Sequence, residues 1–432
     1  MKPRALGYNQ ASPLVMHIDL NSCFTTIEQQ GNRLLRGKPV AVAAYATPQG
    51  FVLAASYEAK RLGIKLGVNV GQARQMCPEI IVMTPDPSKY REAHRRFKDI
   101  LQAYTSDVHP KSIDEFVLHL GGSPIWRAGK SMPDIGYEIK DRIHEHIGEA
   151  VNVNVGIGPN RFLAKLAAGL HKPDGLDVID HTNLEKTYAN LELMDLPGIN
   201  VRFDARLRAG GVKTPLDFLR ADVDHLQKRI FKSITGYYWY LRLRGWEIDA
   251  YETQLRSIGH QYALKNKTWD RDELNTLLLK MCEKTGRRLR KNGLYAHGIA
   301  LYMGFVTRGG GRWGHHEDVD GHPSRWAHSE KTAARLYSTQ DIYQAALRML
   351  NKAVLYDKVA LLAVTVFRLQ PCDPEQLTIF DDQRSFSANR HLSDALDDIN
   401  NRYGEFKITP ALMADMQGTI LDRIAFGNVR DL

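Results

Sequence analysis

The chain has 432 residues, enough for about three domains of ordinary size, each with its own core. Hydrophobic residues make up 43% of it and charged residues 25%, which argues against global disorder and against a fibrous protein. No apolar run approaches the roughly 18 residues of a membrane span, and no signal sequence follows the N-terminus, so we expect a cytoplasmic protein without a membrane partner. The four widely spaced cysteines are too few for a disulfide scaffold, and we expect them to be reduced.

The net charge of +9 is concentrated in one region of the chain. Between residues 200 and 313, 22 Lys and Arg stand against 11 Asp and Glu. Such a basic block is typical of a protein that binds a polyanion, because Lys and Arg that neutralise phosphates release condensed counterions. A solvated basic surface without a partner explains the charge about equally well.

In the first half of the chain, strand and helix patterns alternate. The apolar periodicity predicts strands at 15–20, 40–45, 50–55, 113–120 and 151–157, and helices after Asn21, at 88–106 and at 135–147. This order indicates one sheet-based core within the first 180 residues or so, with a subdomain inserted at about 25–85.

The second half carries two further patterns. Residues 196–219 predict a hairpin of short helices with Gly211 at the turn, which resembles a helix-hairpin-helix DNA-binding element, although a plain helix joint has the same pattern. From residue 256 on, the order strand, helix, strand, strand, helix, strand predicts a ferredoxin-like domain, with helices at 270–292 and 339–354 and strands at 256–264, 294–306, 326–336 and 358–369. Arg287, Arg288, Arg290 and Lys291, near the end of the first of these helices, are candidates for phosphate contacts.

Acidic residues lie in two of the predicted strands of the first half. Asp19 ends the first strand, and Asp114 and Glu115 lie in the strand at 113–120. Carboxylates on adjacent strands can hold two Mg²⁺ ions about 3.5 to 4 Å apart, an arrangement that performs phosphoryl transfer. Because neighbours in a regular strand point to opposite faces, Asp114 and Glu115 can both serve only at a turn or an irregular pairing. Ordinary surface carboxylates are the alternative.

Four motifs in this order carry a resemblance to a known family. They are DLNSCF at 19–24, SYEAK at 56–60, SIDE at 112–115 and GIGPNRFLAK at 156–165. With the hairpin and the basic domain that follow, the chain resembles the Y-family translesion DNA polymerases, and within that family its bacterial branches, over about residues 14–370.

The resemblance implies an α+β multidomain fold shaped as a right hand. Its expected parts are a ferredoxin-like palm (1–24 and 86–178), small fingers (25–85), a helix-hairpin-helix thumb (179–247), a linker (248–256), a ferredoxin-like little finger (257–371) and a C-terminal tail (372–432). It also implies a DNA-directed DNA polymerase that performs error-prone translesion synthesis on a primer-template with deoxynucleoside triphosphates.

The family assigns roles to the matching residues. Asp19, Asp114 and Glu115, with the Leu20 carbonyl, match the positions that hold two Mg²⁺ ions. Phe24 matches the steric gate against the ribose 2′-hydroxyl, although without the motif it reads as an ordinary core aromatic. Tyr57, Lys60 and Lys165 match the contacts to the incoming triphosphate. We expect Pro159 in the first turn of the helix that presents Lys165.

The sequence departs from the family pattern at four positions. Asn21 stands where many relatives have a second Asp, which the family does not require as a metal ligand. Cys23 replaces an aromatic residue beside the gate and puts sugar discrimination in question. Ala54 replaces a phosphate-binding Thr and Lys60 an Arg, which predicts weaker triphosphate affinity. None of these changes removes a metal ligand.

Residues 376–380 resemble the pentapeptide with which bacterial polymerases bind the sliding clamp. Gln376 would be the polar anchor, and Leu377, Ile379 and Phe380 would fill an apolar pocket. The clamp is therefore an expected partner of a protein that we otherwise expect to be monomeric.

Two other functions fit part of the sequence. A catalytically silent polymerase-like adaptor would bind DNA and the clamp, although such relatives lose the acidic residues. A two-metal nuclease would use the same metal chemistry and would shorten a primer.

Overall fold

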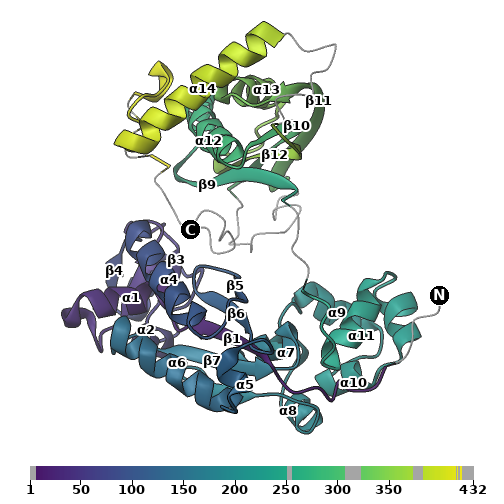
Figure 1. Cartoon of the computed structure of the whole chain (residues 1–432). Helices are drawn as coiled ribbons and strands as arrows, with labels where there is room; N and C mark the ends of the chain where they lie inside the picture. The colour runs from purple at the N-terminus through teal and green to yellow at the C-terminus, as the bar shows by residue number, and fades with distance from the viewer. Residues whose placement is uncertain are drawn as a thin grey trace. The chain divides into compact units, whose positions relative to one another are not determined.

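The computed structural model describes residues 6–250, 255–306, 323–372, 383–414, 416 and 419–420. Residues 6–250 belong to one compact unit and the described residues from 255 on to a second, and each unit is described by itself (Figure 1). Within the described residues, no helix is both long and apolar enough to cross a membrane. All four cysteines are free thiols, and three of them, Cys23, Cys77 and Cys282, are buried.

The larger sheet of the first unit has the central strand β1 (Val15–Leu20). The strand order is β5-β6-β1-β7-β8, with β5 at Val108–Pro110, β6 at Glu115–His119, β7 at Val153–Gly158 and β8 at Leu176–Val178. Strand β1 runs antiparallel to both β6 and β7. Alternate residues of β1 face opposite sides of the sheet, and Met16, Ile18 and Leu20 enter a core that also contains residues of α4 (Pro87–Gln102) and α6 (Met132–His146).

The other face of β1 lies under helix α7 (Arg161–Leu170), which packs on β7 and β1. Gly156 of β7 permits this approach, because a Cβ atom there would lie 2.0 Å from the Ala164 carbonyl oxygen. The helix begins after Asn160, whose side-chain oxygen accepts a hydrogen bond from the Leu163 N–H at 2.8 Å. The prediction that Pro159 lies in the first turn was therefore wrong: Pro159 precedes the cap, because the Asn side chain already satisfies a free N–H of that turn.

The inserted subdomain is built on a second sheet of the first unit. Its strand order is β3-β2-β4, with β2 at Val40–Ala43, β3 at Val52–Ala55 and β4 at Ile81–Met83. Its helices are α2 (Tyr57–Arg61) and α3 (Val70–Met76), and α1 (Cys23–Gly31) leads into it from β1. A turn of 3-10 helix at Arg33–Leu35 follows α1, and the short helix α5 (Pro124–Arg127) follows β6.

The rest of the first unit is helical, with a core centred on Phe218 and Trp239. Its elements are α8 (Leu184–Ala189), a 3-10 turn (Leu193–Asp195), α9 (Val201–Ala209), α10 (Pro215–Arg220), a π-helical turn (His225–Ile230) and α11 (Thr235–Leu243). Helices α9 and α10 form the predicted hairpin, and Gly211 in the turn has a φ of +85°, a value that side chains rarely tolerate.

The second unit is an antiparallel sheet covered by helices on one face (Figure 1). The elements follow the predicted order: β9 (Ser257–Thr268), α12 (Arg271–Lys291), β10 (Leu294–Phe305), β11 (Arg325–Leu336), α13 (Thr339–Lys352) and β12 (Val359–Pro371). The sheet order is β11-β10-β12-β9, so the second and fourth strands form its centre. Helix α14 (Gln383–Tyr403) and a 3-10 turn (Ala411–Met413) complete the unit.

Helix α14 lies against the basic side of α12, where the sequence suggested phosphate contacts. Arg290 donates two hydrogen bonds to the Asp397 carboxylate, at 2.6 and 3.0 Å. Arg287 donates to Asn401 and to Glu405. Arg288 donates to the Gly259 carbonyl oxygen at 3.0 Å. Arg287 and Arg290 are thus bound to side chains of the same unit, and their contacts with phosphate stay a prediction.

The close approach of α7 to β7 predicts that Gly156→Ala destabilises the first unit. The added methyl group meets helix backbone, which cannot rotate away, so we expect a loss of about 1 to 3 kcal/mol, read as a lower midpoint of thermal unfolding. Gly169→Ala, within α7, is the control. A Cβ there meets nothing within 4 Å, and the change should be neutral or stabilising by up to about 1 kcal/mol. Equal midpoints for the two variants would contradict this packing.

Candidate active site

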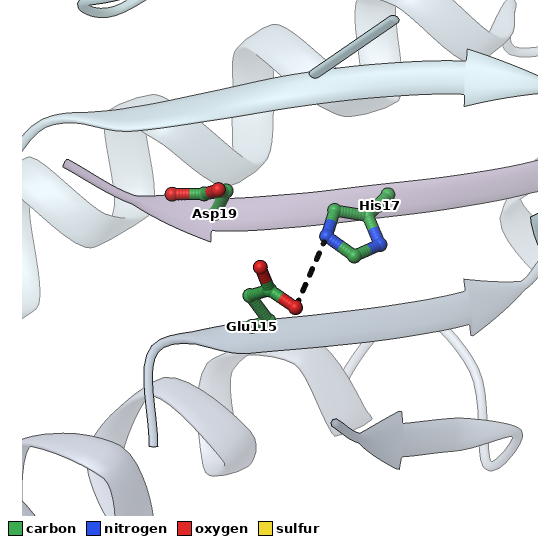
Figure 2. A group of neighbouring side chains, drawn as sticks. All are labelled: His17, Asp19 and Glu115. Atoms are coloured by element: carbon green, nitrogen blue, oxygen red, sulfur yellow. Dashed lines mark ion pairs between the residues drawn. The ribbon is translucent and has the colours of Figure 1, made fainter. Parts of the chain in front are cut away.

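Two carboxylates lie side by side at one end of the larger sheet. Asp19 of β1 is paired directly with Glu115 of β6, so both side chains emerge on the face under α7. His17, two residues earlier on β1, is on the same face (Figure 2). One ligand atom from each of these three residues lies within 4.8 Å of the other two.

Asp114 lies beside this group but is not a member of it. Strand β6 begins at Glu115 rather than at 113, and residues 112–114 form a bend. In the bend the Ser112 hydroxyl donates to the Asp114 carboxylate, and the Leu20 N–H donates to the Asp114 carbonyl oxygen at 2.9 Å. In a regular strand Asp114 and Glu115 would point to opposite faces of the sheet. Because Asp114 lies in the bend and not in the strand, both side chains can serve one site. The Leu20 N–H thereby ties the bend to the end of β1.

Two lysines neutralise the paired carboxylates. Lys165 of α7 donates to both oxygens of Glu115, at 2.9 and 2.7 Å. Lys172, from the loop after α7, donates to Asp19 at 2.6 Å. Two partly buried carboxylates this close repel each other, and the ammonium groups offset that repulsion. Each carboxylate of the pair is therefore already bound to a cation.

The environments of the three carboxyl groups differ. Burial raises the pKa of Asp19 and outweighs the opposing effect of Lys172. Burial also raises the pKa of Asp114, more than the hydrogen bond from Ser112 lowers it. For Glu115 burial acts in the same direction, but His17 and Lys165 together outweigh it, and the pKa of Glu115 is lowered. A cation brought to Asp19 and Asp114 would relieve the cost of burying their charge.

Asn21 has a structural role in placing Lys172. Its side-chain amide donates to Asn154 at 2.9 Å, and its oxygen accepts from the Asp174 N–H at 2.8 Å. Asn154 in turn donates to the His171 carbonyl oxygen at 3.0 Å. These bonds connect the end of β1 to both sides of Lys172. The Asn at this position therefore fits a hydrogen-bonded joint rather than a metal ligand.

Two of the predicted triphosphate contacts converge beside β1. Lys60 of α2 donates to the Ser22 hydroxyl at 2.7 Å and lies 4.6 Å from the centre of the Tyr57 ring. Burial raises the pKa of Tyr57 to about 12, and burial lowers the pKa of Lys60. Ser22 immediately precedes α1 in a left-handed conformation with a φ of +50°. The hydroxyl of Tyr57 and the ammonium of Lys60 thus both lie at Ser22, which follows Asp19 by three positions in the chain.

Phe24 is 1% exposed and stacks on Tyr90 of α4, with ring centres 4.3 Å apart. The Tyr90 hydroxyl donates to the buried Glu28 carboxylate at 2.9 Å, and Lys89 pairs with the same carboxylate at 2.6 Å. In this state Phe24 is a core aromatic held by α4, in the first turn of the helix that follows Asp19. A role as a sugar gate is a proposal that this packing neither requires nor opposes.

Sequence reasoning missed His17 and Lys172. The alternation of β1 was a signal for His17, since a residue two positions before Asp19 must share its face. Burial lowers the pKa of His17 to about 4, so the ring is neutral near pH 7. No local signal marked Lys172, because it lies in a loop and meets Asp19 from 153 positions away in the sequence. The expected clamp-binding residues Gln376, Leu377, Ile379 and Phe380 lie outside the described residues.

The donor atoms fit a divalent metal ion. Asp19 and Glu115 offer the oxygen ligands that Mg²⁺ and Mn²⁺ prefer, and both carboxylates already bind ammonium groups. Neither ring nitrogen of His17 has a hydrogen-bond partner, which is costly for a side chain that is 2% exposed. A partly exposed carboxylate pair beside an unsatisfied imidazole is the chemistry of a site that a further group completes.

Two family models match the chain: the impB/mucB/samB family at residues 18–169 and the C-terminal domain of that family at residues 255–379. DNA polymerase IV of Pelotomaculum thermopropionicum is 30% identical over 416 residues, which are 95% of this chain and 97% of the relative. DNA polymerase IV of Moorella thermoacetica is 31% identical over 420 residues, 94% of this chain and 97% of the relative.

Solved structures share the fold. A Y-family polymerase chimera of Dbh and Dpo4 aligns with a TM-score of 0.68 at 23% identity, covering 83% of this chain and 99% of the chimera. An insertion ternary complex of Dbh DNA polymerase aligns with the same coverage at a TM-score of 0.51. The chain therefore belongs to the impB/mucB/samB family, the Y family of DNA polymerases, and is similar along nearly its whole length to DNA polymerase IV.

Proposed function

We propose that this Y-family DNA polymerase performs translesion synthesis by two-metal nucleotidyl transfer from deoxynucleoside triphosphates to a primer 3′-hydroxyl. The observation that carries the mechanism is the pairing of Asp19 with Glu115 across β1 and β6, with Asp114 in the adjoining bend. These three carboxylates, with the Leu20 carbonyl, are the groups that would hold two Mg²⁺ ions. When bound, the ions would activate the attacking hydroxyl and stabilise charge on the triphosphate.

The lysines would then change partners. Lys165 and Lys172 are bound to carboxylates that the ions would engage, so metal arrival would leave both ammonium groups free to meet the anionic triphosphate. Lys60 and Tyr57 lie near Ser22, just after the end of β1, where they would contact the same phosphates. The ammonium groups that neutralise the carboxylates in this structure would thus orient the substrate once the metal ions bind.

The remaining proposals concern selection and partners. Phe24, directly after the Asp19 strand, would exclude the ribose 2′-hydroxyl if the sugar lies against the first turn of α1. Residues 376–380 would bind the sliding clamp, which would raise the local concentration of the enzyme at a primer end. A monomeric state and a cytoplasmic location stay predictions.

Asp114→Ala should abolish primer extension while leaving primer-template affinity within about twofold, because it removes one acidic group without touching the basic surfaces. The assay is extension of a labelled primer with Mg²⁺ and four deoxynucleotides, with binding measured by fluorescence anisotropy. Asp107→Ala, an exposed carboxylate just before β5 in the same sheet, is the control and should extend normally. Extension by the Asp114 variant would refute the assignment, and a shortened primer with the parent chain would favour a nuclease.

Phe24→Leu should raise incorporation of ribonucleotides relative to deoxynucleotides by at least about tenfold, because a smaller side chain no longer fills the space of the 2′-hydroxyl (1.4 kcal/mol corresponds to tenfold). Phe97→Leu removes the same ring from the same core at 2% exposure and serves as the control. The measurement is single-nucleotide insertion with each sugar. If both variants keep the parent selectivity, Phe24 is a core residue and not the gate.

Lys172→Met should raise the pKa of Asp19 in the metal-free protein. Lys172 lowers that pKa by its charge and its hydrogen bond, and without it the effect of burial is opposed only by the more distant Lys165. Carboxyl carbon chemical shifts followed against pH report the change directly. Lys165→Met is the matched control, and it should shift the pKa of Asp19 less. A larger shift from the control would mean that Lys172 is not the main partner of Asp19.

A further inference from the structure

His17 is the buried polar side chain of the site that the proposed mechanism does not use. It is 2% exposed, and neither Nδ1 nor Nε2 has a hydrogen-bond partner. A buried polar group without a partner costs on the order of 1 to 3 kcal/mol. An apolar residue of similar volume would avoid that cost, so the position calls for a function.

The polar contact that the ring makes on the neighbouring strands is with Glu115 of β6. On β7 and β6 the residues paired with His17 are Gly156 and Val117, which offer no side-chain hydrogen bond. The backbone of α7 lies directly over Gly156. Diagonally across β6 is Glu115, whose Oε2 lies 3.9 Å from His17 Nε2, as the dashed line in Figure 2 marks.

The separation of 3.9 Å is too long for a hydrogen bond, and the reason is the present partner of Glu115. Both Glu115 oxygens accept hydrogen bonds from Lys165, which lies on the α7 side. Under the proposed function Lys165 leaves for the triphosphate, and the carboxylate then loses both hydrogen bonds that Lys165 donates. A small rotation of the Glu115 side chain would bring Oε2 within hydrogen-bond distance of Nε2.

We propose that His17 is a positioning residue. When Glu115 turns to bind a metal ion, the Nε2–H of His17 donates a hydrogen bond to its carboxylate in place of Lys165. Ligating carboxylates are commonly oriented by a second hydrogen bond, and loss of such a bond costs about 10- to 100-fold in metal affinity. One Glu115 oxygen would bind the ion while the other accepts from the imidazole. This inference rests on the proposed function, because it needs Glu115 to be a metal ligand.

The test uses the full chain, a primer-template with a dideoxy-terminated primer and the next deoxynucleotide, so that no turnover occurs. Mn²⁺ is the probe, and its binding is measured by the loss of the free-ion signal in electron paramagnetic resonance. His17→Leu keeps the volume and removes the donor, and it should weaken Mn²⁺ binding by about tenfold. His17→Gln carries an amide N–H at a similar reach and should restore binding to within about threefold of the parent.

The outcomes separate the possible roles of the ring. Parent-like binding by His17→Leu, or equal losses in His17→Leu and His17→Gln, would overturn the proposal. In a cycle with Glu115→Gln, the change His17→Leu should add no further loss, because His17 acts through Glu115. A further loss in that background would mean that the ring binds the ion itself, and would also overturn the proposal.

Two controls keep the test decisive. Thermal unfolding and primer-template affinity are measured for every variant. If His17→Leu does not fold, His17→Asn replaces it, because its amide is too short to reach Glu115 while remaining polar, and it should bind Mn²⁺ as weakly as expected for Leu. Should Glu115→Gln leave Mn²⁺ binding unchanged, the metal site of the proposed function fails, whereas a loss in Glu115→Gln with none in His17→Leu sinks only the inference about His17.

Discussion

The site depends on holding like charges together inside a sheet. Asp19 and Glu115 face each other across an antiparallel pair, where side chains on adjacent strands are about 5 Å apart and like charges repel. Burial makes the repulsion stronger, as the raised pKa of Asp19 and Asp114 reflects. The fold withstands it because two lysines are delivered to the pair from α7 and from the loop that follows it. A divalent cation bound between the two carboxylates would relieve this repulsion.

Strand β1 divides the tasks of the first unit between its two faces. The residues Met16, Ile18 and Leu20 anchor the strand in the apolar core, which fixes its position rigidly. Val15, His17 and Asp19 face α7, where glycine in β7 lets the helix backbone come close enough for Lys165 to reach Glu115. Rigid packing on one face thus sets the position of the charged groups on the other.

The second unit shows how charge in a sequence can be used internally. The C-terminal half of α12 is strongly basic, yet Asp397 and Glu405 from the region of α14 neutralise Arg290 and Arg287. A run of basic residues therefore predicts an acidic partner but not which one. The partner can be an acidic segment of the same chain as well as a nucleic acid.

The sequence by itself determined the elements and the family: the β-forming run at 15–20 and the alternation within 294–306 predicted strands, and four short motifs identified a Y-family polymerase. Periodicity is local, so it could not give the order β11-β10-β12-β9, which depends on which strands meet after the chain has turned. It also placed Asp114 and Glu115 in one strand, and only the tertiary structure shows that the strand begins two residues later, at Glu115, after a bend that the Leu20 N–H ties to the end of β1. Lys172 and His17 joined the site through a loop contact and a diagonal pair across β6, and such contacts between distant segments arise only when the sheet has formed.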